Sequence, residues 1–405
     1  MDLEKTAQAV IGAQFGDEGK GRLIDYYAAS AGGDCIVIRF NGGAQAGHTV
    51  VTPEGQRHVF SHIGSGAFTG AATFLSRFFV TNPMLFLKER QALKTLGVSP
   101  TVWIDPASPA TTPYDMLINQ IIEKERGVSR HGSCGIGFGE TLERQLDPAY
   151  ALTVADLADT ALADRLNAIR RDYAPARLAR LGFGDAGLRE AELFQSDALL
   201  ERYIEDVRHF LDAVTVCAAP AVIQNRQLLF EGAQGLLLDQ QRGFFPYVTR
   251  SHTGLRNVLT LSSEWHLTRL EVTYATRAYL TRHGAGPLPG ELTEKPYPGV
   301  TDPTNIPNDY QGTLRFAWLN LDQLGTAITE DLSDARLTPE IAVDPRLAMT
   351  CLDQIGTGPA VYLQGGRDHA TTLEALVAAI RSATMLNPVW LGWGPDRNAL
   401  RGYLW

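Results

Sequence analysis

Residues 11–21 read Ile-Gly-Ala-Gln-Phe-Gly-Asp-Glu-Gly-Lys-Gly and continue the short apolar run Ala9-Val10-Ile11. Glycines let backbone N–H groups approach phosphate oxygens and turn into a helix N-terminus, where partial positive charge favours an anion. Lys20 adds a full positive charge to such a site. The stretch therefore predicts a phosphate-binding loop between a buried strand and a helix, and the alternative is an ordinary glycine-rich turn.

This loop departs from the usual Walker A pattern at two positions. Gln14 stands where that pattern has a glycine, and Gly21 stands where it has the serine or threonine that holds magnesium. Asp17 can supply the missing oxygen ligand, and a carboxylate so close to the lysine can also act as a base. We therefore expect phosphate chemistry at a P-loop-like segment, with Asp17 as metal ligand or base.

Composition excludes several classes of protein. A chain of 405 residues with 44% hydrophobic content can bury one large α/β core or two packed lobes. The formal charge of −9 argues against nucleic acid as the main partner. Cys35, Cys134, Cys217 and Cys351 show no zinc-site spacing, which indicates reduced thiols in a cytoplasmic protein. Because no uncharged apolar run reaches about 18 residues, we expect no membrane partner.

The order of apolar and polar segments predicts an α/β fold. Short apolar runs at 35–38 and 228–230 precede glycine-rich turns, as buried strands of a mostly parallel sheet do. Residues 151–216 have helical spacing of apolar and charged residues, which predicts a helical insertion with a solvated face. Residues 281–307 are rich in Gly and Pro and predict a long functional loop. With no repeat or linker, we expect a single elaborated domain spanning 1–405.

Short segments recur in an order that resembles the adenylosuccinate synthetases. The first pair is Gly16-Asp17-Glu18-Gly19-Lys20-Gly21 followed by Asn41-Gly42-Gly43-Ala44-Gln45-Ala46-Gly47-His48-Thr49. The segments at 230–235, 245–249, 281–292 and 394–397 follow. The resemblance therefore runs essentially from end to end of the chain.

The resemblance implies a magnesium-dependent ligase that joins L-aspartate to C6 of a purine nucleoside monophosphate and cleaves a nucleoside triphosphate. The enzyme first moves a γ-phosphoryl group onto O6, and the aspartate amine then displaces phosphate. Positioning and electrostatics dominate such a reaction. The implied fold is a central, mostly parallel sheet with a P-loop-like loop, helical insertions and long active-site loops. The implied assembly is a homodimer with sites near the interface.

The family pattern also implies roles for individual residues. Asp17 would take the N1 proton as O6 attacks, and would ligate Mg²⁺ together with the Gly47 carbonyl. His48 would hydrogen-bond the phosphoryl oxygens, and Lys20 would neutralise the triphosphate. A surface-loop histidine is the alternative for His48.

The nucleotide would contact a larger set of residues. Gln234 and Thr249 would hold the monophosphate and the ring, although either can be a turn residue. Arg144 would reach a phosphate across the dimer interface, and half of a helical ion pair is its alternative. The full set implied for nucleotide binding is Gly16, Glu18, Gly19, Gly21, Gln45, Ser133, Arg144, Gln234, Thr249, Asp353, Gly392 and Gly394.

Three segments depart from the family pattern. The substrate loop, at about 296–318, lacks the usual threonines and arginines and leaves Thr313 and Arg315 for aspartate, with Arg315 the one obvious carboxylate fork. Asp353 can still read guanine, but no lysine precedes Leu352-Asp353 to pack on the base. Residues 130–137 replace a Thr-Thr-Gly-Arg string, with Ser133 as the best remaining hydroxyl.

These departures leave several reactions open. The first reading is inosine monophosphate with aspartate and GTP, giving adenylosuccinate. The alternative is a guanine monophosphate with ATP, as in the phage 2-aminoadenine branch, which residues 391–395 resemble. Well-known members of that branch have a small hydroxyl residue where this chain keeps Asp17, which favours the inosine reading. A nucleotide-binding paralogue without catalysis and a ligase that uses another amine are further alternatives.

Overall fold

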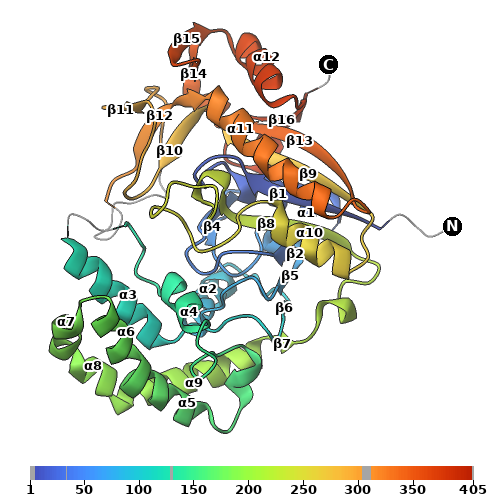
Figure 1. The fold of residues 1–405 in the computed structure, drawn as a ribbon. Coiled ribbons are helices and arrows are strands. Elements are labelled where there is room, and N and C mark those ends of the chain that lie inside the picture. The colour runs from blue at the N-terminus through green and yellow to red at the C-terminus, as the bar shows by residue number, and fades with distance from the viewer. Residues whose placement is uncertain (1–4, 33, 128–130, 303–311, 404–405) are drawn as a thin grey trace.

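The computed structural model describes residues 5–32, 34–127, 131–302 and 312–403 (Figure 1). Its core is a ten-stranded sheet in which neighbouring strands are parallel, except for β17 at one edge. In sheet order the strands are β17 (Leu400–Gly402), β16 (Pro388–Gly392), β13 (Ala342–Thr350), β9 (Arg269–Arg277), β1 (Thr6–Gly12), β8 (Gln227–Gly235), β2 (Cys35–Arg39), β5 (Ala72–Leu75), β6 (Val102–Ile104) and β7 (Thr215–Val216).

The three apolar runs found in the sequence form neighbouring strands at the centre of this sheet. Residues 9–11, 35–38 and 228–230 lie in β1, β2 and β8, and β8 stands between the other two. Every residue of β2 is buried, as expected for a parallel strand that is covered on both faces. The predicted α/β class with a mostly parallel sheet is therefore confirmed.

Helices cover both faces of the sheet. Val10, Val37 and Leu229 pack with α1 (Lys20–Ser30) on one face. The alternate residues of the same strands, such as Ile11 and Phe230, pack in a cluster with α10 (Leu255–Glu264) and α11 (Leu321–Leu332) on the other face. This alternation follows from the two-residue period of side chains along a strand. The loop after β1 therefore begins at a strand that is packed on both faces.

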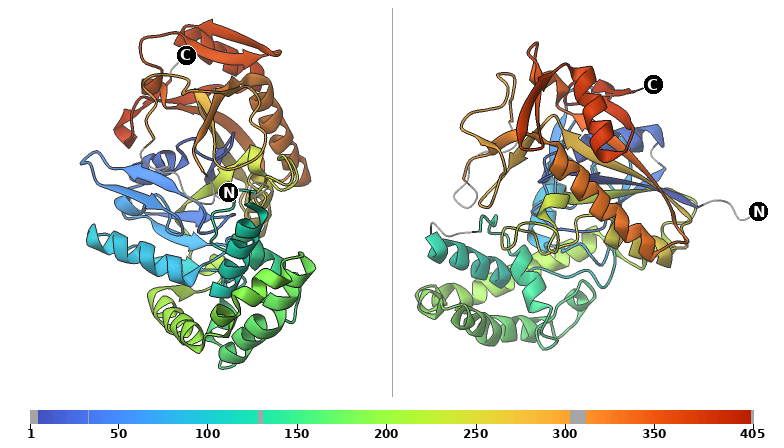
Figure 2. Two further views of the ribbon diagram at one scale, coloured as in Figure 1. Left: turned by 90° about the vertical axis from the view of Figure 1, so that its left-hand side faces the viewer. Right: turned by 45° about the horizontal axis from the view of Figure 1, so that its top comes forward.

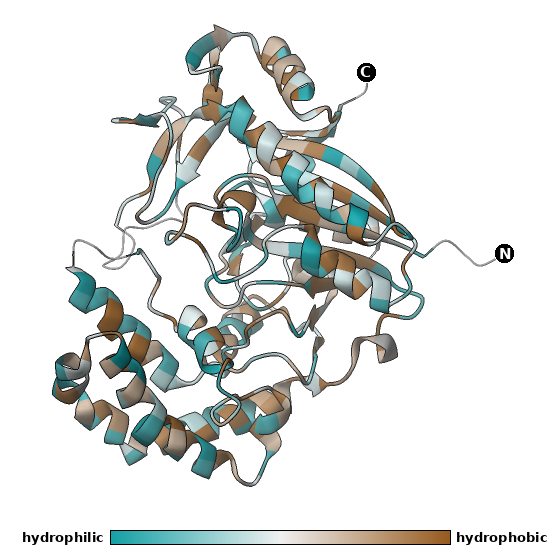
Figure 3. Ribbon diagram, in the orientation of Figure 1, coloured by the Kyte–Doolittle hydropathy of each residue, from teal (hydrophilic) through white to brown (hydrophobic). Residues whose placement is uncertain are grey.

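A group of helices forms one end of the molecule, drawn in teal and green (Figures 1 and 2). The helices α5 to α9 fall inside residues 151–216, and they pack with α2 and α3 in a second apolar core. Their ribbons carry hydrophobic and hydrophilic residues in turn (Figure 3), as amphipathic helices do. The bounds are α2 (Pro83–Thr95), α3 (Pro113–Arg126), α4 (Phe138–Arg144), α5 (Leu162–Ala168), α6 (Ala174–Arg180), α7 (Gly184–Arg189), α8 (Ala191–Gln195) and α9 (Asp197–Ala213).

A smaller five-stranded sheet lies at the opposite end, with α12 (Leu373–Thr384) beside it (Figure 1). It corrects part of the loop prediction for 281–307, because residues 281–282 end β10 and residues 291–292 form β11. The rest of that prediction, and of the substrate loop, includes residues 303–311, which lie outside the described residues. The strands are β10 (Tyr279–Arg282), β11 (Glu291–Leu292), β12 (Arg315–Asn320), β14 (Ala360–Gln364) and β15 (Arg367–Thr371), and β3 (His48–Val51) pairs separately with β4 (Arg57–Phe60).

The carboxyl ends of the central strands gather polar residues at one edge of the sheet. The strands β1, β8, β9 and β13 end at Gly12, Gly235, Arg277 and Thr350. In open parallel sheets, ligands bind in the crevice outside these ends. The site is therefore sought around the loop that follows β1.

Candidate active site

Glu18 organises the loop between β1 and α1 from inside. Its carboxylate is 1% exposed and accepts hydrogen bonds from the backbone N–H groups of Gln14 (2.9 Å) and Gly16 (2.8 Å). Gly19 then caps α1 with φ 78°, a left-handed conformation that suits glycine. The side chain of Glu18, which we expected at the nucleotide, therefore acts within the loop, where it directs backbone rather than contacting a ligand.

Lys20 lies buried beside this carboxylate. Its Nζ donates to Glu18 Oε2 at 2.9 Å and to the carbonyl of Gly16 at 2.6 Å. Burial alone raises the pKa of Glu18, but the charge of Lys20 and its hydrogen bond hold that pKa below the usual value. Lys20 thus stands at the N-terminus of α1 as a fixed charge in the phosphate-binding loop.

Asp17 is placed differently from its neighbour Glu18. Among the described residues, no hydrogen-bond donor pairs with its carboxylate, and the ring of His283 lies beside it, with Nε2 3.7 Å from Asp17 Oδ2. The backbone carbonyl of Asp17 accepts from the guanidinium of Arg277 at the end of β9. The backbone is therefore held while the carboxylate is left to bind a ligand or a hard cation.

His48 begins β3 and faces a buried carboxylate that the sequence did not single out. His48 Nδ1 lies 2.6 Å from Glu231 Oε1, and Nε2 lies 3.2 Å from the carbonyl of Ala233. A Cβ on Gly21 would stand 3.0 Å from His48 Cβ, so the glycine allows α1 to pack against the histidine. Lys20, Gly21 and His48 are thereby brought together, as the resemblance implied.

Glu231 is fully buried and ionised. Burial raises its pKa, but the charges of Arg39 (3.1 Å) and His48 outweigh burial and lower the pKa to about 2. Ser65 also donates hydrogen bonds to the Glu231 carboxylate, from its N–H (3.1 Å) and from its hydroxyl. Burial lowers the pKa of His48, and the charge of Glu231 opposes that effect. The sequence signal for Glu231 was its place in the segment 230–235, three residues before Gln234.

Two glutamine side chains converge on the loop at Gly42 and Gly43. A Cβ on Gly42 would stand 3.2 Å from Gln234 Oε1, and one on Gly43 would stand 3.1 Å from Gln45 Oε1. Within the described part of the chain, both amide atoms of Gln45 and Oε1 of Gln234 are buried without a hydrogen-bond partner. Buried amides are costly to leave unpaired, so this geometry suits two residues that await a polar ligand. Thr249 is half-buried on the neighbouring loop, where its N–H donates to Leu238 (2.9 Å).

Arg144 is not placed to bind a phosphate. Its guanidinium is fully buried and donates to both carboxylate oxygens of Asp115, at 2.8 and 2.9 Å. The guanidinium also donates to the carbonyls of Ala110 (2.8 Å) and Tyr150 (2.7 Å). The structure therefore places Arg144 in an ion pair, although the pair joins two helices and does not lie within one helix. The pair joins α4 to α3 and leaves no donor facing solvent.

Two further expected ligands are occupied by the protein itself. The Ser133 hydroxyl donates to Asn119 Oδ1 at 3.0 Å. Arg315 binds the carboxylate of Glu291 and donates to the carbonyls of Gly284 (3.0 Å) and Gly286 (2.8 Å), and Thr313 nearby is exposed. Arg315 therefore needs to exchange partners before it can hold a substrate carboxylate. Arg130, three residues before Ser133, lies outside the described residues.

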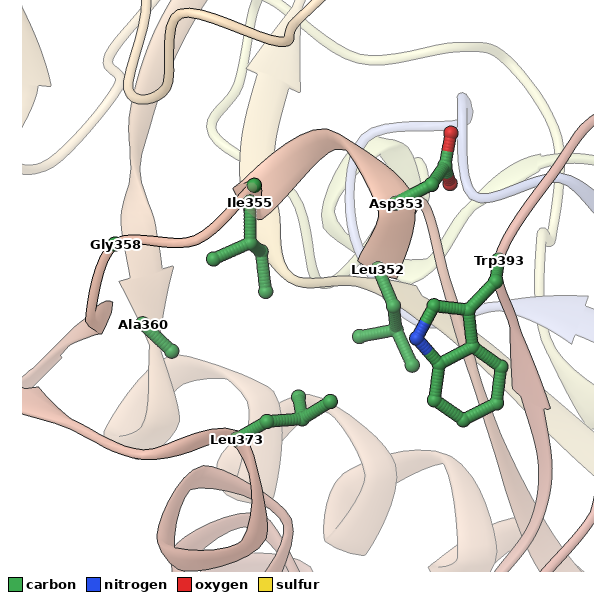
Figure 4. Close-up of a pocket in the computed structure, with 8 residues that line it drawn as sticks. Leu352, Asp353, Ile355, Gly358, Ala360, Leu373 and Trp393 are labelled. Carbon is green, nitrogen blue, oxygen red and sulfur yellow. The ribbon is translucent and has the colours of Figure 1, made fainter.

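A cavity of about 190 Å³ lies near the C-terminal part of the central sheet. Trp393 and Leu352 reach its edge, with the carboxylate of Asp353 close by (Figure 4). Gly392 and Gly394 lie next to it, and the guanidinium of Arg22 donates to the carbonyl of Gly394. The lining residues are Leu352, Asp353, Ile355, Gly356, Gly358, Ala360, Leu373 and Trp393.

Comparison with known proteins identifies the family of this chain. A family model described as adenylosuccinate synthetase matches residues 9–313. The chain belongs to the adenylosuccinate synthetase family. The adenylosuccinate synthetase of Thermoplasma acidophilum is 29% identical over 98% of this chain and 88% of its own length. That of Desulfosudis oleivorans is 30% identical over 97% of this chain and 89% of its own length.

Two solved structures share the fold. Fully ligated adenylosuccinate synthetase from Plasmodium falciparum has a TM-score of 0.71 at 19% identity, covering 98% of this chain and all of that one. Cyanophage S-2L succinoaminodeoxyadenylate synthetase, bound to dGMP and dATP, has a TM-score of 0.63 at 17% identity, covering 99% of this chain and 96% of that one.

Membership of the adenylosuccinate synthetase family fixes the reaction class. The chain is a ligase that forms a C–N bond on a purine nucleotide, and its family uses a divalent metal. In the described ranges, no helix has the length and apolar content needed to span a bilayer.

Proposed function

We propose that the enzyme joins L-aspartate to C6 of inosine monophosphate, giving adenylosuccinate, with cleavage of GTP and with Mg²⁺ bound. The observation that carries the proposal is that a carboxylate without a hydrogen-bond donor among the described residues, a buried lysine and a carboxylate-held histidine lie in the segments at the carboxyl edge of the sheet. These are Asp17, Lys20 and His48. Family membership supports this set, because the resemblance assigns chemistry to the same three positions.

The chemistry requires two steps, since a purine 6-oxo group is a poor leaving group. In the first step Asp17 accepts the N1 proton, O6 bonds to the γ-phosphorus, and the bond from that phosphorus to the nucleoside diphosphate breaks. In the second step the aspartate amine bonds to C6 and gives up one proton, the C6–O6 bond breaks, and phosphate leaves with O6 and takes up that proton. Lys20 offsets negative charge on the phosphates, and His48 Nε2 hydrogen-bonds the transferred group.

The residues at the loop fit magnesium. Mg²⁺ binds one or two carboxylates together with substrate phosphates and waters, and the Asp17 carboxylate has no competing donor among the described residues. No group of three or more His, Cys, Asp or Glu side chains suited to a metal occurs in the described ranges, so phosphates would complete the ligand set. Asp17 and the exposed Gly47 would hold the ion, which when bound neutralises charge on the phosphates.

The remaining assignments follow from unpaired groups and open space. Gln45, Gln234 and Thr249 would hold the monophosphate and its base. Arg315 would bind a carboxylate of aspartate after release from Glu291. The cavity beside Asp353 would take the base of the triphosphate. We also propose a cytoplasmic homodimer, and the four free cysteines support the cytoplasmic setting.

A guanine monophosphate with ATP is the second candidate pair of nucleotides. Trp393 lines the triphosphate cavity beside Asp353, and Cys351 rather than a lysine precedes Leu352. A flat aromatic ring stacks on either purine, so this cavity does not require guanine. Asp17 favours inosine monophosphate, because a small residue there would leave more room for a 2-amino group.

The test measures phosphate release by purified enzyme with Mg²⁺ and aspartate. Inosine, guanosine and deoxyguanosine monophosphates are crossed with ATP and GTP, and the product mass identifies the joined nucleotide. We expect turnover with inosine monophosphate and GTP. Turnover with a guanine monophosphate alone would establish the second candidate. Absence of turnover in every pair would contradict both, in favour of another amine donor or a non-catalytic role.

A further inference from the structure

His283 is a half-buried side chain that has no role in the proposed reaction. It directly follows β10, and both of its ring nitrogens are shielded from solvent without a hydrogen-bond partner among the described residues. Asp17 Oδ2 lies 3.7 Å from Nε2, which is beyond hydrogen-bond distance. An imidazole in this state is costly, so the unpaired nitrogens indicate a polar ligand.

The backbone on the amino side of His283 is fixed against the phosphate-binding loop. The buried guanidinium of Arg282 donates to the carbonyls of Pro287 (2.6 Å) and Tyr247 (2.9 Å). Its central carbon lies 4.6 Å from the centre of the Phe15 ring, and Phe15 precedes Gly16-Asp17 in the loop. This stacking contact ties the end of β10 to the loop that carries Asp17.

The backbone on the carboxyl side is equally constrained. Gly284 has φ 69°, and its Cβ position would meet the Gly132 carbonyl at 3.3 Å. Arg315 holds the Gly284 carbonyl at 3.0 Å. The ring of His283 is thus presented beside Asp17 by a preorganised segment, which is a property of binding residues more than of filler in a core.

The edge of a 6-oxopurine offers a suitable ligand for this pair of side chains. N1–H is a donor that a carboxylate accepts, and the next ring position along the same edge is C2. An amino group at C2 is a further donor, whereas a hydrogen at C2 offers nothing. A neutral imidazole has one acceptor nitrogen and can take a hydrogen bond from that amino group.

We propose that His283 is a base-contacting residue that accepts a hydrogen bond from a 2-amino group on the purine held by Asp17. The enzyme then binds guanine monophosphates in addition to inosine monophosphate, and His283 sets the ratio between them. The inference rests on the proposed function, since it takes Asp17 as the group that meets N1. It goes beyond that function by naming the residue that reads C2.

The test is calorimetric binding of inosine and guanosine monophosphates to the wild-type enzyme and to His283→Leu. We expect His283→Leu to weaken guanosine monophosphate binding by about tenfold, the usual effect of losing one hydrogen bond, and to change inosine monophosphate binding by no more than about twofold. His283→Gln keeps an acceptor and should restore part of the loss. The matched control is His209→Leu on the exposed face of α9, which should leave both affinities unchanged.

The outcomes separate the inference from the proposed function. Equal weakening of both nucleotides, or no change in either, would overturn the role of His283 while leaving the ligase proposal intact. Binding of neither nucleotide by the wild-type enzyme would contradict the proposed function, and the inference with it. Thermal unfolding of each variant checks its fold, and His283→Gln provides the comparison if His283→Leu unfolds.

Discussion

Glu231 holds the ring of His48 at the centre of the site, and its effect should be catalytic rather than structural. Glu231→Gln keeps the shape of the side chain but removes the charge that faces His48 Nδ1 at 2.6 Å. We expect kcat to fall roughly ten- to a hundredfold, as when the partner of a working histidine is lost, while KM for each substrate changes little. Steady-state kinetics with each substrate varied in turn checks this.

A second buried carboxylate provides the control for this substitution. Glu89 is also buried, pairs with His58 and His62, and has a pKa held below its usual value, where burial is opposed by hydrogen bonds from both histidines. Glu89→Gln should destabilise the protein without a comparable loss of kcat. In a His48→Asn background, Glu231→Gln should add little further loss, and a full additional loss would show that Glu231 does not act through His48.

The ion pair of Arg144 and Asp115 fastens α4 to the first turn of α3. Asp115 also completes the capping box of α3 with Thr112. Removing one member of a buried pair leaves an uncompensated charge, so Arg144→Met should lower the free energy of unfolding by about 3–5 kcal/mol. Urea denaturation measures this loss.

The same variant tests whether Arg144 meets a nucleotide. Arg144→Met with Asp115→Asn removes both charges and should recover part of the lost stability. At a temperature where the single variant is folded, its KM for the monophosphate should equal that of the wild type. A specific rise in that KM would restore the phosphate-binding role that the sequence suggested.

Asp331 on α11 contacts α10 and β9, and its burial makes the free energy of unfolding depend on pH. It accepts hydrogen bonds from the Leu255 N–H (2.9 Å) of α10, the Tyr274 hydroxyl (2.8 Å) of β9 and Arg242 (3.1 Å). Burial, the largest influence, raises the pKa of Asp331 from 3.8 to about 6. The folded state therefore binds the proton more tightly than the unfolded state, so this group adds stability at low pH and loses it as pH rises through about 6.

Asp331→Asn should remove this dependence. The stability of the wild type relative to the variant should fall as pH rises from about 4 to 7, by up to roughly 3 kcal/mol. Urea denaturation across this range measures the difference, with Glu330→Gln on the exposed face of the same helix as control. A difference that is flat with pH would mean that Asp331 does not titrate there in the folded state.

The sequence predicted the α/β fold class because apolar runs and glycine-rich turns are local patterns that indicate buried strands. The strands β1, β2 and β8 and the loop after β1 follow directly from such runs. The pairing of β1 between β8 and β9 could not be predicted, because it joins segments more than 200 residues apart. Strand order depends on packing that no short segment encodes.

The site shows the same division between local pattern and distant contact. Asp17, Lys20 and His48 could be singled out as candidates because they sit in short glycine-rich segments. The opposite roles of the adjacent Asp17 and Glu18 could not be predicted, because only the folded loop turns one carboxylate inward and leaves the other without a hydrogen-bond donor among the described residues. The pairing of Arg144 with Asp115 could not be predicted for a related reason, since the two residues are 29 residues apart along the chain.

The central claim is that O6 of the purine is phosphorylated before the amine attacks. The most direct test uses inosine monophosphate labelled with oxygen-18 at O6, together with GTP, aspartate and Mg²⁺, and measures the label in released phosphate by mass spectrometry. The proposed mechanism predicts one labelled oxygen in each phosphate for every adenylosuccinate formed. Adenylosuccinate formed with unlabelled phosphate would contradict it, because O6 would then have left without ever bonding to phosphorus.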